Sequence, residues 1–383
     1  MQLHTRNVNT AFRTLVEYFN EGSNVQREDS RNGAVLRIPE PVTITYSHPR
    51  ERVLFSAARD ANPFSLLYES LWMLAGRNDV SSLVYYTKQF QEYSDDGKIL
   101  NGAYGYRWRN ANTYDSRPQE TDQLNLIAQH LKANPQSRRA VLAMWSVEND
   151  LLNVGSSKDV CCNLNVMFSL RKEVDVSNWD NFPPEAYYLD MTVTNRSNDM
   201  IWGLLGANYV TFSILQEYMA ARLGVEVGVY HHFTNNLHVS EWNWKPKEWL
   251  DDVEMHSYPT EDHKGRSTGD YLGNGVHWKN RTTIVKDPTV FDQEVKEFVE
   301  HHSKCADVRP WSEPFLKLVA EPMMIAYHWY KKTDKDRFEP ALEVARRIKA
   351  DDWRITCLNW LQRRKKPPSL TPSRWKIWGT GRV

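Results

Sequence analysis

The segment from Asp190 to Asn208 (DMTVTNRSNDMIWGLLGAN) constrains the fold more than any other part of the chain. Met191 and Val193 alternate with threonines, which is typical of a half-buried strand, and the apolar periodicity of residues 209–223 predicts a buried helix. Residues 196–208 between them carry a cation, amides, a hydroxyl and a carboxylate, and we expect a loop there. As a tetrapeptide, RSND is equally typical of an ordinary turn. The mixture of groups over the whole segment favours a binding loop on an α/β (α+β) scaffold.

Charge and hydropathy exclude several classes of protein. The 383 residues contain 48 Lys plus Arg and 48 Asp plus Glu, so no overall field favours nucleic acid or an anionic membrane. No apolar run approaches the ~18 residues that span a bilayer, and the first residues lack the apolar core of a signal peptide. We expect a cytoplasmic protein, in the host cytoplasm if the chain is phage-encoded. The cysteines form no CxxC pair, and we expect reduced thiols and no metal site.

Two short motifs suggest chemistry, although each is weak alone. Arg31 lies in an Asn-Gly turn (DSRNG), where an arginine is usually solvated. Glu69 lies in residues 63–76, a predicted helix that is apolar on almost every side. A carboxylate in such a helix is either paired with a base or kept for proton transfer, because burial raises its pKa.

Two further motifs stand in the middle of the chain. Arg138 and Arg139 are adjacent, at the predicted end of a helix and start of a strand, where a solvated face is the ordinary interpretation. Cys161 and Cys162 precede a predicted strand. A buried cysteine is more often an inert apolar side chain than a nucleophile.

Together and in this order, these motifs resemble the thymidylate synthase family. Residues 101–108 (NGAYGYRW) are similar to the family's G-P-V-Y-G-x-x-W segment, and DVCCN at 159–163 stands where the family has P-C-H or P-C-N. The resemblance implies a thymidylate synthase-like fold with a twisted mixed sheet that forms a dimer interface. It also implies Cys162 as nucleophile, with Cys161 as a second candidate, and Glu69, Tyr104 and Asn208 as the other catalytic residues.

The resemblance further implies the binding residues. The dimer partner would donate Arg138 and Arg139 to the nucleotide phosphate. The expected nucleotide-binding residues are Arg31, Arg138, Arg139, Arg196, Ser197, Asn208 and His238. The expected donor is 5,10-methylenetetrahydrofolate, bound by Asp199, Gly203 and Phe90. Arginines from both subunits would lower the pKa of the Cys162 thiol.

Departures from the family pattern bear on the product. Asn163 replaces the usual His, Ser240 stands where the sugar-binding Tyr belongs, and the C-terminal strand and tail that close the folate site are not evident. Because hydride transfer needs a lid that excludes water, we expect 5-hydroxymethylation of dUMP, as in phage-type hydroxymethylases. Thymidylate synthesis, dCMP hydroxymethylation and a non-catalytic nucleotide-binding homologue remain alternatives. One extra residue in the loop leaves Ala207 or Asn208 to read the base, and ribose against deoxyribose is open.

The composition changes toward the C-terminus. The resemblance fades after about residue 245, and four helices are expected near residues 291–302, 314–331, 340–350 and 353–364. We expect a catalytic domain at 1–284, a helical extension at 285–366 and a basic tail at 367–383, which we interpret as mobile rather than as a nucleic-acid contact. Residues 178–185 are expected to be an inserted surface loop.

Overall fold

The computed structural model describes residues 1–31, 33–110, 121–173, 186–255, 271, 276, 282–303, 307–334 and 336–365. The expected loop at 178–185, the basic tail and Cys305 lie outside these residues. None of the helices in the described ranges has the length and hydropathy that a membrane crossing requires.

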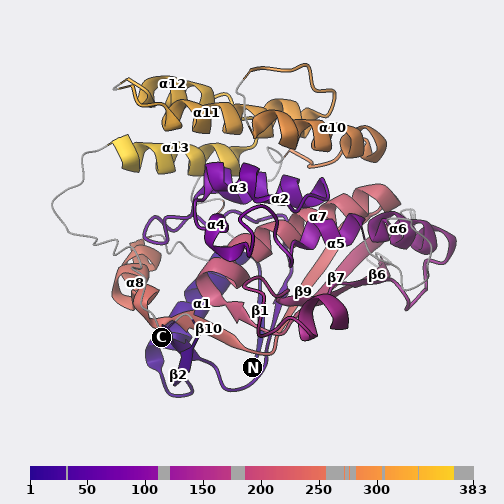
Figure 1. Cartoon of the computed structure of the whole chain (residues 1–383), viewed down its shortest axis with the longest axis vertical. Coiled ribbons are helices and arrows are strands. Elements are labelled where there is room, and N and C mark those ends of the chain that lie inside the picture. The colour runs from indigo at the N-terminus through magenta and orange to yellow at the C-terminus, as the bar shows by residue number, and fades with distance from the viewer. Residues whose placement is uncertain are drawn as a thin grey trace, which may run out of the picture.

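A mixed six-stranded sheet carries the core (Figure 1). The strand order is β1, β4, β9, β7, β6, β5, with bounds Gln2–Thr5, Val42–Tyr46, Glu226–Thr234, Ala186–Asn195, Asn163–Glu173 and Val141–Ala143. Strand β7 runs antiparallel to β6 and parallel to β9, which places Met191 between Phe168 and Tyr230. These three side chains are buried, whereas Met167 on the opposite face is exposed. The period of two therefore gives the sheet one buried face and one open face.

A second, four-stranded sheet brings three predicted binding segments together. Its order is β2, β3, β10, β8, with bounds Gln26–Ser30, Gly33–Arg37, Leu237–Ser240 and Asn198–Asp199. The β2–β3 hairpin holds Arg31 in its turn, and β10 places His238 opposite Asp199 of β8.

Helices cover the buried face of the large sheet. Helix α7 (Asn208–Leu223) packs on β7 and β9, and α2 (Pro63–Leu74) packs on α7. Both are apolar on nearly every side because they lie between other elements. Helix α1 (Val8–Glu21) begins at the capping side chain of Asn7 and ends at Gly22, whose φ of 70° favours glycine. The remaining short elements are α3 (Val80–Tyr86), α4 (Phe90–Tyr93), α5 (Tyr104–Arg109), α6 (Gln123–Ala133), η1 (Val147–Leu151), η3 (Glu241–Asn243) and α8 (Pro246–Met255).

The C-terminal helices form an outer layer over α2 and α3 (Figure 1). They are α10 (Pro288–His302), η5 (Leu316–Ala320), α11 (Glu321–Lys331), α12 (Phe338–Ala345) and α13 (Asp351–Lys365). The Tyr68 hydroxyl donates to the Val299 carbonyl at 2.8 Å, and that of Tyr327 donates to the Tyr86 carbonyl at 3.1 Å. The helical extension is therefore confirmed and is bonded to the first part of the chain. The domain boundary at 284/285 stays a prediction.

The expected loop at 196–208 is wrong in its secondary structure. After the two residues of β8 the chain forms a π-helical turn, η2 (Met200–Ala207), which leads directly into α7. The Asp199 carboxylate accepts hydrogen bonds from the backbone N–H groups of Ile201 and Trp202, each at 2.8 Å. This side chain caps the helix start, a role that a sequence of polar residues and glycines does not distinguish from a turn.

Candidate active site

The cysteine pair lies at the start of β6, held by the end of β7. The Arg196 guanidinium donates from Nε to the Cys161 carbonyl and from Nη2 to the Val160 carbonyl, both at 2.9 Å. The Arg196 backbone N–H also donates to the Cys162 carbonyl at 2.9 Å. Arg196 thus fixes the backbone that presents the two thiols.

The surroundings of the two thiols differ. Cys161 is 1% exposed and its Sγ lies 3.1 Å from the Asn163 carbonyl oxygen, whereas Cys162 is only half-buried. Burial raises the pKa of both thiols, strongly so at Cys161. At Cys162 the guanidiniums of Arg196 and Arg31 oppose burial. Within one chain desolvation outweighs these two charges, and the expected lowering of the Cys162 pKa, which relied on arginines from both subunits, stays a prediction.

Tyr104, the first residue of α5, lies near Cys162. Its ring stacks on Phe212 of α7, with ring centroids 5.8 Å apart. Burial, and next the proximity of Cys162, raise the Tyr104 pKa well above its ordinary value. The phenol therefore stays protonated and is able to donate a hydrogen bond.

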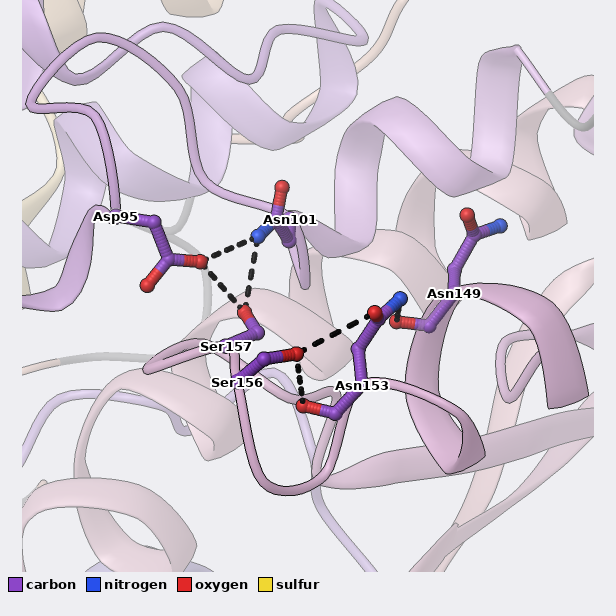
Figure 2. A pocket seen from close by; sticks show the side chains of 6 residues that line it. All are labelled: Asp95, Asn101, Asn149, Asn153, Ser156 and Ser157. Atoms are coloured by element: carbon purple, nitrogen blue, oxygen red, sulfur yellow. Dashed lines mark hydrogen bonds between the residues drawn. The ribbon is translucent and has the colours of Figure 1, made fainter.

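A polar network holds the segment that leads to the cysteines. A pocket with a volume of about 260 Å³ lies beside this segment. One oxygen of Asp95, which lines it, accepts from Ser157 Oγ at 2.7 Å and from Asn101 Nδ2 at 2.8 Å (Figure 2). Nearby, an Asp159 oxygen accepts from the Gly102 backbone N–H at 2.7 Å. These contacts tie residues 157–159 to the segment before Tyr104. These hydrogen bonds therefore hold in place the segment that leads to the cysteines.

Glu69 projects from α2 as a half-buried carboxyl group. Among the described residues it has no hydrogen-bond or ion-pair partner, and burial raises its pKa from 4.5 to about 7. A group with this pKa is able both to release and to accept a proton near neutral pH. Burial, and then the charges of Glu92, Glu69 and Asp199, raise the pKa of Tyr93, so Glu69 and Asp199 lie near one tyrosine.

The start of η2 presents an aromatic surface beside Asp199. Trp202 is 41% exposed, and the Arg59 guanidinium lies 4.5 Å from its ring centroid. Arg59 also donates to the Ile201 carbonyl at 3.0 Å, which fixes the cation over the ring. Ser240 donates to the second Asp199 oxygen at 3.4 Å.

Asn208 belongs to a buried chain of polar side chains. Its Nδ2 donates to Asn198 Oδ1 at 3.0 Å, and Asn198 Nδ2 lies 3.1 Å from His232 Nε2. His232 Nδ1 lies 2.6 Å from the Tyr230 hydroxyl. A Cβ at Gly203 would lie 2.0 Å from Asn198 Oδ1. The fold therefore requires a glycine at this position whether or not a cofactor binds there.

Several predicted residues lie at the edges of this region. Arg31 donates to the Lys158 carbonyl at 3.2 Å, and His238 Nδ1 lies 3.0 Å from Asn236 Oδ1. Ser197 is half-buried, and the Phe90 ring centroid lies 6.2 Å from that of Tyr93.

Arg138 and Arg139 are placed differently from the other predicted arginines. Both are exposed between α6 and β5, and neither forms an ion pair with a described residue. Among the residues that the structure describes, no hydrogen bond or ion pair brings them to Cys162.

The sequence did not single out Asn198, His232, Asp159, Arg59 or Tyr93. A buried amide or imidazole leaves no periodic signal, and Arg59 acts through a contact 142 residues away. Two of them stand inside motifs that the sequence analysis quoted, Asn198 in RSND and Asp159 in DVCCN.

A family model described as thymidylate synthase matches residues 12–260 of the chain. This chain belongs to the thymidylate synthase family.

Three relatives extend the comparison. The chain is 40% identical over 365 residues to a protein of Pseudomonas phage M6 named deoxyuridylate hydroxymethyltransferase, across 95% of this chain and 94% of the relative. A protein of the same name from Bacillus phage SP01 is 41% identical over 54% of this chain and 51% of its own length. The thymidylate synthase of Streptococcus mutans is 29% identical over 42% of this chain and 56% of its own length. The match to the first relative covers 95% of this chain, so it continues past residue 260 into the sequence of the C-terminal helices.

Proposed function

We propose that this chain is a deoxyuridylate hydroxymethyltransferase that adds a one-carbon unit to C5 of dUMP. The observation that carries the proposal is the half-buried Cys162 thiol, which lies near the Arg196 and Arg31 guanidiniums and the Tyr104 phenol. Two relatives carry this activity in their names. The protein of Pseudomonas phage M6 is 40% identical over 95% of this chain, and that of Bacillus phage SP01 is 41% identical over 54% of it. A non-catalytic binder would have no use for a half-buried thiol flanked by arginines together with a half-buried carboxyl of pKa about 7.

Cys162 would supply the activation that the uracil ring requires. The sulfur adds to C6, and the electrons of the C5–C6 double bond move toward O4, which makes C5 a nucleophile. Asn208 would bind the N3 and O4 edge, where enolate charge collects. Glu69 would transfer protons at O4 and C5 through water, because its pKa of about 7 permits both directions. After C5 has gained its substituent and lost its proton, the sulfur leaves C6.

Residues from both subunits of a homodimer would together form the phosphate site. Arg31, Arg196 and Ser197 belong to this chain, and His238 would hold the sugar hydroxyl. We assign Arg138 and Arg139 to the partner's nucleotide, because they are exposed and unpaired among the described residues. The open face of the large sheet, with Met167 39% exposed, is a suitable surface for the two-fold contact.

The surface beside Asp199 fits a folate. Exposed Trp202 and Tyr93 offer flat apolar area to a pterin ring, and Phe90 and Gly203 lie in the same region. One Asp199 oxygen is used in the helix cap, and the other, which accepts from Ser240 at 3.4 Å, has a second lone pair for a pterin N–H. When bound, 5,10-methylenetetrahydrofolate supplies one carbon at the oxidation level of formaldehyde.

Hydroxymethylation rather than methylation is favoured by polar replacements near the site. Ser240, where the family has a tyrosine, bonds to Asp199 instead of covering the sugar. Asn163 is fully buried, with Nδ2 donating to Asn195 Oδ1 at 2.8 Å. A serine in place of a tyrosine removes a large side chain that would help to exclude water from the site. The proposed place of action is the cytoplasm, that of the host cell if the chain is phage-encoded.

The test is tritium release from [5-³H]dUMP and [5-³H]dCMP with methylenetetrahydrofolate. We expect release from dUMP, a product mass that matches 5-hydroxymethyl-dUMP, and no absorbance increase from dihydrofolate. A dihydrofolate signal would instead identify a thymidylate synthase, and release from dCMP alone would identify the cytosine enzyme. Absence of release from both nucleotides would refute the proposed activity.

A further inference from the structure

The buried chain behind Asn208 links three elements that are distant in the sequence. Asn198 lies in β8, His232 and Tyr230 lie on the same face of β9, and Asn208 begins α7. Asn198 is 4% exposed and both β9 residues are 0% exposed. Such a network is rigid, because each member loses its hydrogen bond if another rotates.

The protonation state of His232 and the orientation of the two amides determine which group donates in each hydrogen bond of this network. Burial lowers the pKa of His232 to about 3, so the ring is neutral and carries one N–H. Asn208 Nδ2 donates to Asn198 Oδ1, which turns Asn198 Nδ2 toward His232 Nε2. That nitrogen must therefore accept, and His232 Nδ1–H donates to the Tyr230 hydroxyl.

This order leaves Asn208 with one N–H and one carbonyl oxygen for a base. Uracil offers an acceptor at O4 and a donor at N3, whereas cytosine offers a donor at N4 and an acceptor at N3. An unrestrained amide serves either base by turning over. Here a turned Asn208 would set its oxygen against Asn198 Oδ1, two acceptors in contact, unless Asn198 and the His232 tautomer also reversed.

Gly203 provides independent evidence that the contact is built into the fold. A Cβ at this position would lie 2.0 Å from Asn198 Oδ1 and 3.2 Å from Asn208 Nδ2. The first turn of η2 therefore keeps a space that the two amides fill. The same π-helical turn makes Asn208, and not Ala207, the residue that contacts Asn198.

We propose that Asn198 is a positioning residue, held by His232, which fixes the orientation of the Asn208 amide and makes the site select uracil over cytosine. The inference rests on the proposed function, because it assumes that Asn208 binds the base. It assigns specificity to a residue that does not touch the substrate. An amide that cannot turn over rejects the wrong base, because a donor would then face a donor and an acceptor would face an acceptor, and each would stay unpaired.

The experiment compares dissociation constants of dUMP and dCMP by calorimetry, without folate, on the full chain. Asn198→Leu removes both hydrogen bonds at similar volume, and we expect the preference for dUMP to fall by about tenfold or more. Asn198→Asp keeps the acceptor for Asn208 and should retain the preference. In the same way His232→Phe should lose the preference, and His232→Gln, which keeps an acceptor for Asn198, should retain most of it.

Thr234→Val is the matched control. Thr234 lies on the same strand and face as His232 and is 1% exposed, and its hydroxyl has no hydrogen-bond partner among the described residues. Its replacement should leave the preference unchanged. Equal preference in wild type, Asn198→Leu and His232→Phe would overturn the proposal, and if one of these two does not fold, the other decides.

The outcomes separate this inference from the proposed function. A wild-type protein that prefers dUMP, together with variants that prefer it as strongly, refutes the positioning role alone. A wild-type preference for dCMP that the two variants relax supports the positioning of the amide and refutes the choice of uracil. A wild type that binds neither nucleotide refutes the proposed function and the inference with it.

Discussion

Replacing Glu69 with glutamine tests whether an unpaired carboxyl group is held in the site at a cost in stability. Burial raises the Glu69 pKa from 4.5 to about 7. At 1.36 kcal/mol per pKa unit, the ionised group would destabilise the fold by about 3 kcal/mol at most, and partial solvent access reduces this to about 1–2 kcal/mol. Below pH 4.5 the carboxyl is neutral in both the folded and unfolded states and the cost vanishes. Wild-type stability should therefore fall relative to the variant as pH rises from 4.5 through 7.

The assay is urea unfolding of wild type and Glu69→Gln from pH 4.5 to 8.5, followed by the fluorescence of the 15 tryptophans. The variant should match wild type at pH 4.5 and exceed it by about 1–2 kcal/mol at pH 8.5. Over the same range its tritium release should be about 10²- to 10⁴-fold slower. Parallel stability curves for the two proteins across this pH range would refute the reasoning.

Glu217→Gln is a control of opposite sign. Burial raises the Glu217 pKa, but Arg52, 2.5 Å away, and Arg50 outweigh burial and hold the pKa below its usual range. The stability that this carboxylate contributes is present above the unfolded pKa and is lost as pH falls through the lower folded value. Glu217→Gln should thus lose about 3–5 kcal/mol at pH 7, because Arg52 is left buried and unpaired.

Three other predictions concern the nucleophile, the dimer and the extension. Cys162→Ser should abolish tritium release while Cys161→Ser retains it, and the opposite result would transfer the nucleophile to Cys161. The double variant Arg138→Met, Arg139→Met and the variant Cys162→Ser should each be inactive. If the arginines act across a two-fold interface, mixing and reassembling the two should recover up to about a quarter of wild-type activity, because half of the dimers are then mixed and each has one intact site. No recovery would place the arginines in their own subunit's site or outside the chemistry. Asp292→Ala removes the acceptor of Arg109, Tyr218 and Arg222, and should lower the free energy of unfolding by about 2–4 kcal/mol in a urea titration, unless the C-terminal layer is held by apolar packing alone.

Local patterns in the sequence were sufficient for most elements and for the family. The strand before residue 196, the helix of Glu69 and the C-terminal helices were all predicted, because burial on one face leaves a period that neighbouring residues carry. The same pattern predicted a Glu69 removed from water but left open whether a basic group pairs with it, and among the described residues the structure shows no such partner.

The pKa of Cys162 shows where such patterns end. The nearby arginines suggested a lowered value, but the net direction depends on how much water the fold removes from the sulfur. That quantity is a sum over elements that meet only in three dimensions. The same limit applies to the loop at 196–208, whose helical turn depends on a cap that Asp199 forms with its own chain.

The sequence by itself determined the family and most of the helices and strands, because these depend on neighbours along the chain. Only the tertiary structure decided which of Ala207 and Asn208 contacts Asn198, and only it brought His232 to that amide from 34 residues away. The physical reason is that, in a buried network, each group donates or accepts according to what its neighbour does. Here the direction of the Asn208–Asn198 hydrogen bond depends on His232 and Tyr230, which lie on a different strand.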